Sequence, residues 1–367
     1  MEFSLKQLFK KNWLAIVTTA ITVAVLVYFL VTTDGINAFL SVASDLKVSW
    51  IVLMFVAVFA NWALEGTALH YITRRIYPDW PLKNSIVIGM VGLLYGALTP
   101  FSSGGQPMQV YFMKKMGADP GKAAAVITVK TMVYQVVMVI FAVVMVVWKL
   151  PFFQQQNISN FWFITLIGLA ANLLFISAVF FFSFHQKLTS RIVTALINLL
   201  HKMHLCKNPE KRKESILGAF RMYFESTRLV GRSVSMYLVV GIMQMAQIFV
   251  TCIVPYCIYR SFGFHGASLM NMVAAQSFVT MVSAFVPLPG ASGGAEGSFY
   301  IYFNMFFQKN TLVPAIFIWR IMTYYLTIFV GCFFAVFGKR IPCRTLRENP
   351  KLAKVQLQSP DDIPFSE

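Results

Sequence analysis

The amino-acid sequence predicts an all-α polytopic membrane protein, and three observations support this fold class. Of the 367 residues, 57% are hydrophobic and only 12% are charged, whereas soluble domains carry about 25% charged residues. Several apolar runs reach the length of about 20 residues that a helix needs to cross a bilayer. Two other apolar segments are interrupted by one shared motif. We therefore expect about six full spans plus two re-entrant helical hairpins, which is eight transmembrane segments in a simple count.

The predicted full spans are long apolar segments with few charges. They are Trp13–Val31, Val48–Tyr71, Lys122–Trp148, Phe161–Phe184, Val234–Ile258 and Val313–Phe337. The first follows several lysines, as a signal peptide would, but Thr-Thr-Asp follows it instead of a small-residue cleavage site. We expect it to remain as an uncleaved helix.

The two interrupted segments share the pattern Pro-x-x-Ser-Gly-Gly, at Pro100–Gly105 and at Pro289–Gly294. The segment before the first motif, Asn84–Thr99, is too short to cross the membrane, and the chain resumes as Gln106–Met113. We predict a re-entrant hairpin there. The segment before the second motif, Ala267–Val286, is long enough to cross, so the sequence leaves open whether it dips and returns or spans.

The repetition extends beyond the glycines. About thirty positions after each motif's proline comes a basic-x-Met-x-Tyr sequence, from Lys130 to Tyr134 and from Arg320 to Tyr324. We expect a transmembrane domain over residues 1–340 with an inverted repeat, repeat A at about 48–148 and repeat B at about 233–337. A basic amphipathic cytoplasmic insertion is expected at 185–232 and a cytoplasmic tail at 341–367.

The distribution of basic residues predicts the orientation. The net charge of +17 would suggest nucleic acid as a partner of a soluble protein, but membrane proteins concentrate Lys and Arg in cytoplasmic loops. With a cytoplasmic N-terminus and two re-entrant hairpins, only four basic residues fall outside, namely Lys47, Lys149, Arg260 and Lys309. We therefore expect both termini in the cytoplasm and no nucleic-acid partner.

The motifs predict a substrate site. Irregular backbone survives at membrane depth only where protein buries it or where it lines a wet cavity. Breaks at corresponding positions of two halves indicate a transporter's midplane site, and glycine-rich backbone can present N–H groups to an anion. We expect these residues to line a lipid-headgroup cavity: Ser102, Ser103, Gly104, Gly105, Ser292, Gly293 and Gly294.

Two cations lie within predicted spans, and Tyr134 and Tyr324 accompany them. A cation at bilayer depth costs about 2.5–3.5 kcal/mol and normally has a partner. Lys130 and Arg320 could bind a lipid phosphate, or could form structural ion pairs with Glu65 and Glu296, and Lys130 could also extend to the cytoplasmic surface. The two glutamates could instead contact a headgroup amine. The sequence leaves these alternatives open.

Other chemistry finds no support in the sequence. The five histidines lack ligand spacing, so we expect no metal. Neither glycine motif has the Gly-Lys-Ser/Thr of a phosphate-binding loop, and we expect no cofactor. We find no nucleophile elbow and no paired catalytic carboxylates, so we predict no catalytic residue.

The two motifs carry a family resemblance. Thr99–Pro107, the Lys- and Met-rich segment to Gly117, and Pro287–Gly297 resemble the transmembrane domain of the lysylphosphatidylglycerol synthase/flippase family, over about residues 10–340. In full-length members this domain is taken to move aminoacylated phosphatidylglycerol between leaflets, which confers resistance to cationic antimicrobial peptides. A separate C-terminal domain makes the lipid. Because this chain ends about 30 residues after its last predicted span, we expect that domain to be absent.

The resemblance implies a flippase-like lipid translocase of the bacterial cell membrane. Its substrate would be an anionic or aminoacylated phospholipid such as lysylphosphatidylglycerol. A membrane-embedded phosphatidylglycerol lysyltransferase and a non-transporting scaffold are the alternatives, and an enzyme is the less expected. We expect membrane lipid as a partner. The sequence leaves open whether the chain forms a homo-oligomer and whether it works with a separate lipid-synthesising enzyme.

Overall fold

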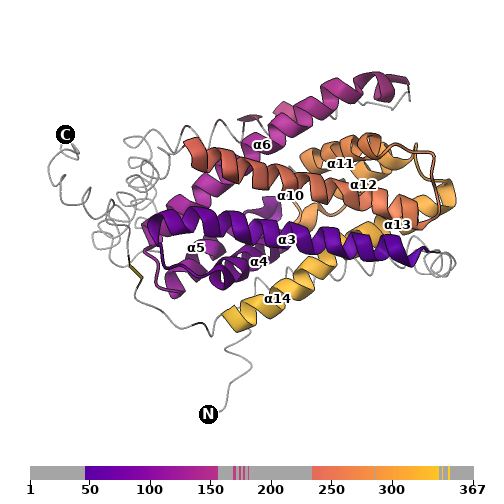
Figure 1. Ribbon diagram of the computed structural model, residues 1–367. Helices are drawn as coiled ribbons and strands as arrows, with labels where there is room; N and C mark the ends of the chain where they lie inside the picture. Colours follow the sequence, from indigo (N-terminus) through magenta and orange to yellow (C-terminus); the bar gives the residue numbers. More distant parts are fainter. Residues whose placement is uncertain are drawn as a thin grey trace, which may run out of the picture.

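The computed structural model describes residues 46–155, 234–284 and 286–338, together with isolated positions between 168 and 181 and at 341, 346 and 347. Regular structure in these residues is helical throughout (Figure 1), which confirms the predicted all-α class. The predicted span Trp13–Val31, the insertion 185–232 and most of the tail lie outside the described residues. Of the predicted span Phe161–Phe184, only isolated helical positions are described.

The helices follow one order in both halves of the chain. The first half contains α3 (Val48–Ile76), α4 (Leu82–Leu98), the 3-10 turn η1 (Pro100–Ser102), α5 (Gly105–Lys115) and α6 (Pro120–Gln155). The second half contains α10 (Val234–Ser261), α11 (Leu269–Ser283), the 3-10 turn η2 (Pro289–Ala291), α12 (Gly294–Phe303), α13 (Lys309–Arg320), the π-helical turn η3 (Ile321–Tyr325) and α14 (Leu326–Gly338).

Four helical segments of the described part are long and apolar enough to cross a membrane. They are α3, α6, α10 and the continuous segment Lys309–Gly338. The apolar helices α4 and α11 are shorter, with 17 and 15 residues. Repeated long apolar helices make the chain a polytopic membrane protein.

The helix ends carry the expected sequence signals. Asp119 precedes α6, and its carboxylate accepts the backbone N–H groups of Gly121 at 2.8 Å and Lys122 at 3.1 Å, while Pro120 occupies the first helical turn, where its missing N–H costs nothing. Arg74 and Arg75 lie in the last turn of α3, where positive charge complements the helix dipole.

Both interrupted segments form helical hairpins. In the first hairpin, α4 packs against α5 on either side of η1, and in the second, α11 packs against α12 on either side of η2. The two turns η1 and η2 contact each other, and η2 also contacts α4. The tips of the two hairpins, which are far apart in the sequence, therefore meet.

The antiparallel pair α3 and α10 holds the two halves together, and the two helices run side by side in Figure 1. At one end, the backbone N–H of Lys47 donates to the carbonyl of Ser261 at 2.9 Å, and the Arg260 guanidinium lies 4.7 Å from the centre of the Trp50 ring. Toward the other end, Glu65 meets Gln247. This pair carries one of the two polar clusters described below.

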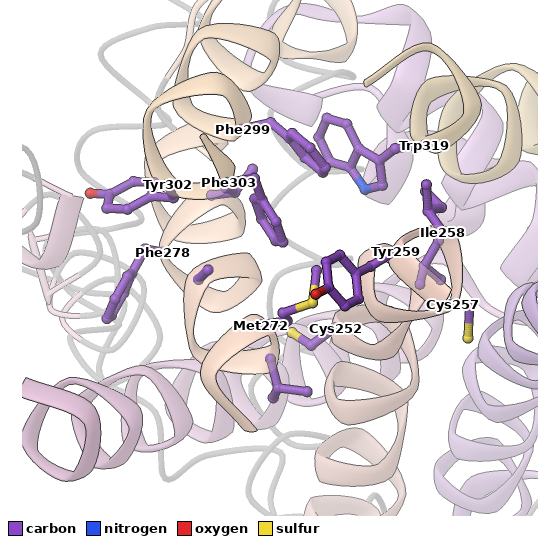
Figure 2. Close-up of a cluster of buried hydrophobic side chains, with 14 of the residues drawn as sticks. Cys252, Cys257, Ile258, Tyr259, Met272, Phe278, Phe299, Tyr302, Phe303 and Trp319 are labelled. Carbon is purple, nitrogen blue, oxygen red and sulfur yellow. The ribbon is translucent and has the colours of Figure 1, made fainter. Parts of the chain in front are cut away.

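Apolar packing supports each hairpin separately. An aromatic cluster surrounds the second hairpin, and Figure 2 shows Phe299 and Phe303 near Trp319; the two phenylalanine rings stack with centroids 4.1 Å apart. A second cluster, which includes Ile88 and Phe112, packs around the first hairpin. Each tip is therefore presented by a packed pair of helices.

The close approach of the first hairpin's arms depends on Gly105. A Cβ atom at this position would lie 2.7 Å from the backbone oxygen of Gly92 on α4. We expect Gly105→Ala to lower stability by about 1–3 kcal/mol, because backbone must move to remove the overlap. Thermal unfolding in detergent micelles measures this.

The matched control is Gly297→Ala on α12, where a Cβ would meet nothing within 4 Å. In that helix the substitution should stabilise by about 0.5–1 kcal/mol. Equal shifts for Gly105→Ala and Gly297→Ala would contradict the packing role of Gly105.

Candidate functional site at the meeting hairpins

The two hairpin tips share left-handed backbone at the second and third residues of the motif, whereas Gly104 has a φ angle of −80° and the aligned Gly293 has 82°. Phe101 and Ser102 have φ angles of 53° and 54°, and the aligned residues Gly290 and Ala291 have 61° and 53°. Phe101, Ser102 and Ala291 are the positive-φ residues other than glycine in the described part of the chain. Left-handed backbone costs a residue with a side chain about 1–2 kcal/mol, so strained residues are confined to the two motifs.

The tips also share their hydrogen bonds. The backbone N–H of the motif serine donates to the motif proline's carbonyl, at 3.1 Å from Ser103 to Pro100 and at 3.3 Å from Ser292 to Pro289. Each serine hydroxyl donates to the same carbonyl at 2.9 Å. The stretch from proline to serine in each motif thus forms the same hydrogen-bonded turn.

The tips differ in how their glycine N–H groups are satisfied. The Thr99 hydroxyl accepts the N–H of Gly104 at 2.8 Å, while the Glu296 carboxylate accepts the N–H of Gly293 at 2.7 Å. These two donors are occupied by the protein itself. Of the anion cradle expected from the sequence, Gly104 and Gly293 therefore already bind an internal oxygen.

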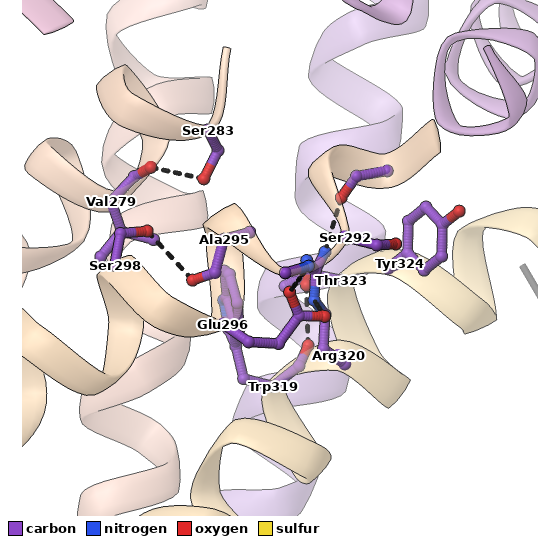
Figure 3. Close-up of polar contacts among 12 residues, drawn as sticks. Val279, Ser283, Ser292, Ala295, Glu296, Ser298, Trp319, Arg320, Thr323 and Tyr324 are labelled. Carbon is purple, nitrogen blue, oxygen red and sulfur yellow. Dashed lines mark hydrogen bonds and ion pairs between the residues drawn. The ribbon is translucent and has the colours of Figure 1, made fainter. Parts of the chain in front are cut away.

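Arg320 lies at the second tip, where α13 passes into η3. Its Nε donates to Glu296 Oε1 at 2.7 Å and its Nη1 donates to the carbonyl of Gly290 at 3.0 Å. Figure 3 shows the arginine facing Glu296 beside Ser292 and Tyr324. The residue is 7% exposed, and its Nη2 has no hydrogen-bond partner among the described residues.

Tyr324 connects the second tip to the first half of the chain. Its hydroxyl donates to the carbonyl of Ala97 on α4 at 3.1 Å. Gly290 lies directly on the tyrosine ring, since a Cβ atom there would be 2.3 Å from ring carbons. The π-helical turn that carries Tyr324 is a rare conformation that occurs frequently at functional sites.

Lys130 forms the other predicted ion pair. Its ammonium group contacts Glu65 Oε1. Gln109 Nε2 donates to the same oxygen at 3.4 Å, and Gln247 Nε2 donates to Glu65 Oε2 at 3.3 Å. Of the alternatives that the sequence left open, the structure forms the ion pair for both cations, and the buried lysine does not extend to the surface.

The predicted site residues therefore separate into two groups. The hairpin tips bring together Ser292, Gly293, Gly294, Glu296, Arg320 and Tyr324, opposite Ser102, Ser103, Gly104 and Gly105. Glu65, Lys130 and Tyr134 belong to the second, buried group. Sequence reasoning missed the Gly290 carbonyl, Gln109 and Gln247. Gln247 had one available signal, a glutamine within the apolar helix α10.

Comparison with known proteins places the chain in a family. Residues 12–331 match the family model described as the lysylphosphatidylglycerol synthase TM region. The chain belongs to this family. The resemblance that the two motifs predicted is thereby confirmed, and the match includes the described helices α3, α6 and α10 and ends within α14.

Proteins of similar sequence occur in Archaeoglobus fulgidus and in two Mycoplasma species. A UPF0104 membrane protein of Archaeoglobus fulgidus is 23% identical, over 78% of this chain and 86% of that protein. The protein MG306 of Mycoplasma genitalium is 19% identical, over 91% of this chain and 90% of the relative. Its homolog in Mycoplasma pneumoniae is 18% identical, over 90% and 89%.

Metal chemistry gains no support from the described geometry of this family member. Within residues 46–155, 234–284 and 286–338, His, Cys, Asp and Glu side chains form no group of three or more that could hold a metal ion. The chemistry available at the tips is recognition by a guanidinium group, hydroxyl groups and backbone.

The strained turn of the second tip gives a stability prediction. We expect Ala291→Gly to stabilise the protein by about 1 kcal/mol, because glycine adopts the positive φ at no steric cost. The control Ala295→Gly, in the following helix α12, should destabilise by about 1 kcal/mol. Thermal unfolding in micelles compares them, and a loss of stability in both variants would contradict the assigned strain.

The buried pair gives a second prediction, by a double-mutant cycle. Lys130→Met should destabilise by about 3–5 kcal/mol, because it leaves Glu65 charged and unpaired in the interior. The double variant Lys130→Met/Glu65→Gln should recover most of this loss, since both charges are removed. Unfolding in micelles measures all four proteins, and additive losses would show that the two residues are not coupled.

Proposed function

We propose that this protein is a lipid translocase that moves an anionic or aminoacylated phospholipid, such as lysylphosphatidylglycerol, between the leaflets of the cell membrane. The observation that carries the proposal is the meeting of the two strained hairpin tips around a buried arginine. Arg320 has a guanidinium N–H group that no described protein atom accepts. A lipid phosphate brings the acceptor oxygens and the negative charge that this group lacks.

The fixed geometry of Arg320 supports phosphate recognition. Glu296 holds Nε and the Gly290 carbonyl holds Nη1, while the guanidinium carbon lies 5.0 Å from the centre of the Trp319 ring. With two of its nitrogens held, the guanidinium plane is preorganised and Nη2 presents a fixed direction. Burying a polar donor without a partner costs about 1–3 kcal/mol, which a ligand oxygen would recover.

The opposite tip supplies groups that suit the remainder of a lipid. Ser102 and Ser103 are exposed, so their hydroxyl groups are accessible to a polar headgroup, although that of Ser103 also donates to Pro100. Phe101 is 57% exposed and Leu288 of the second tip is 51% exposed. Apolar side chains beside polar turns match the boundary between a headgroup and its acyl chains.

The proposed movement uses the repeated architecture. We infer that the two hairpins are re-entrant and that residues 48–148 and 233–337 are inverted repeats around the tips, with both termini cytoplasmic. In transporters built this way, one repeat rocks against the other and exposes a midplane site to each side in turn. The hydrogen bond from Tyr324 to Ala97 is one contact that such a motion would break and re-form. The family description, which names lysylphosphatidylglycerol synthase, supports a phospholipid substrate.

A transport assay with purified protein in liposomes tests the proposal. The assay follows fluorescent phosphatidylglycerol and lysylphosphatidylglycerol by chemical quenching of the outer leaflet. We expect Arg320→Gln to reduce the movement rate about thirtyfold, since loss of a buried charged partner costs about 2 kcal/mol or more. Arg320→Lys should recover only part of the rate, because an ammonium group lacks the planar fork.

The matched control is Arg260→Gln. Arg260 also stacks on aromatic rings and has a buried Nε without a partner among the described residues, but it lies at the end of α10 beside Trp50, away from both tips. Its loss should leave the rate unchanged.

Equal rates for Arg320→Gln and the wild type would reject the site, while a wild-type rate equal to that of protein-free liposomes would reject the translocase. A lipid species missing from cells that lack the protein would favour a lipid-modifying enzyme.

A further inference from the structure

One side chain connects both hairpins to the arginine of the proposed phosphate site. Tyr324 lies in the π-helical turn η3, four residues after Arg320, and is 7% exposed. Figure 3 shows its ring beside Ser292, with the hydroxyl pointing away from Glu296. The hydroxyl and the ring have different partners, and these partners belong to different hairpins.

The hydroxyl of Tyr324 binds the first hairpin. It donates to the carbonyl of Ala97 at 3.1 Å, in the last turn of α4, where carbonyl groups have no partner within the helix. Thr99 satisfies the two preceding carbonyls, with its hydroxyl donating to Tyr95 at 2.6 Å and its backbone N–H donating to Gly96 at 3.4 Å. The carbonyl of Ala97 is therefore satisfied from the other half of the chain.

The ring of Tyr324 packs against the second tip. Gly290 lies so close to the ring that a Cβ atom there would be 2.3 Å from two ring carbons. The carbonyl of Gly290 accepts Nη1 of Arg320 at 3.0 Å, and the guanidinium carbon lies 5.4 Å from the centre of the tyrosine ring. Tyr324 thus contacts both Arg320 and the residue that aligns it.

We propose that Tyr324 is a positioning residue that makes the alignment of Arg320 depend on contact between the two hairpins. While the tips touch, the bond to Ala97 fixes the ring, the ring fixes Gly290, and the Gly290 carbonyl fixes Nη1. When the hairpins separate, the hydroxyl loses its acceptor and the ring no longer holds Gly290. Nη2 therefore meets a phosphate in a fixed direction only in the contact state. The change from lipid binding to lipid release rests on the translocase function proposed above.

A purely structural role for Tyr324 makes a different prediction. Tyr324→Phe keeps the ring, its packing on Gly290 and its contact with Arg320, and removes only the hydroxyl. If the tyrosine merely fills space, this variant changes nothing except overall stability. Under the proposal, it loosens the contact between the hairpins.

The matched control is Tyr325→Phe, in the same π-helical turn. The ring of Tyr325 lies 5.0 Å from that of Tyr324, between centroids. Its hydroxyl has no hydrogen-bond partner among the described residues. This variant removes the same group from the neighbouring position without touching the contact between hairpins.

Hydrogen exchange of the full-length protein in detergent micelles tests the contact. Peptides covering the tips contain amides that are bonded within the turns, such as Ser103 to Pro100 and Ser292 to Pro289. We expect Tyr324→Phe to raise exchange at both tips about fivefold, the change that loss of one hydrogen bond produces. Peptides from the paired helices α3 and α10 should be unchanged, and Tyr325→Phe should match the wild type throughout.

Lipid movement in liposomes tests the alignment of Arg320. The rate is measured at increasing fractions of fluorescent phosphatidylglycerol. Tyr324→Phe should raise the half-saturating fraction about two- to fivefold, because the contact state that binds lipid is less populated. Its maximal rate should stay within about twofold of the wild-type rate. Loss of folded protein alone would instead lower the maximal rate and leave half-saturation unchanged, and Tyr325→Phe should reproduce both wild-type values.

The outcomes separate this inference from the proposed function. Exchange at the tips that is equal in Tyr324→Phe and Tyr325→Phe, or that rises equally in α3 and α10, overturns the inference whatever the lipid assay shows. Faster exchange confined to the tips with unchanged half-saturation overturns the link to Arg320 and leaves the translocase intact. Wild-type protein that moves no lipid overturns the translocase and the link to lipid release, while faster exchange confined to the tips still supports the contact.

Discussion

The hydrogen-bonding requirement of broken backbone inside a membrane protein governs this structure. Each Pro-x-x-Ser-Gly-Gly motif ends one helix and starts another, and the freed backbone groups must find partners that lipid cannot supply. Both tips meet the requirement locally, with the proline carbonyl bonded to the serine N–H and hydroxyl. The cost is left-handed backbone at residues with side chains. Because the tips also contact each other, neither broken segment faces lipid alone.

The two halves of the chain pair their buried cations in different ways. Glu296 lies within the second hairpin and bonds both Arg320 and the N–H of Gly293, so that charge is paired at the tip itself. In the first half, the carboxylate that pairs with Lys130 is Glu65 of α3, which lies outside the hairpin. The Thr99 hydroxyl accepts the N–H of Gly104, as Glu296 accepts that of Gly293. Equivalent cations therefore lie in unequal environments. Arg320 Nη2 has no acceptor among the described residues beside the tips, whereas Lys130 is enclosed among helices.

The sequence allowed much of this arrangement to be predicted, for identifiable reasons. Apolar length and the helix-breaking Pro and Gly residues located α3, α10 and both hairpins to within a few residues. The ion pairs stayed open because Glu65 and Lys130 are distant in the chain and only tertiary packing brings them together. Gln109 and Gln247 carry no charge, so they gave no comparable signal. The π-helical turn at Ile321 and the positive φ of Phe101 have no residue signature at all.

The two polar groups are mechanically connected through the first hairpin. Gln109 lies on α5, the arm that follows η1, and its amide bonds both Glu65 and the carbonyl of Ile88 on α4. This one amide therefore ties Glu65 to both arms of the hairpin. Those arms carry the tip that contacts η2, and α4 also accepts the hydrogen bond of Tyr324 four residues beyond Arg320. The Glu65–Lys130 pair and the hairpin tips thus belong to one packed unit.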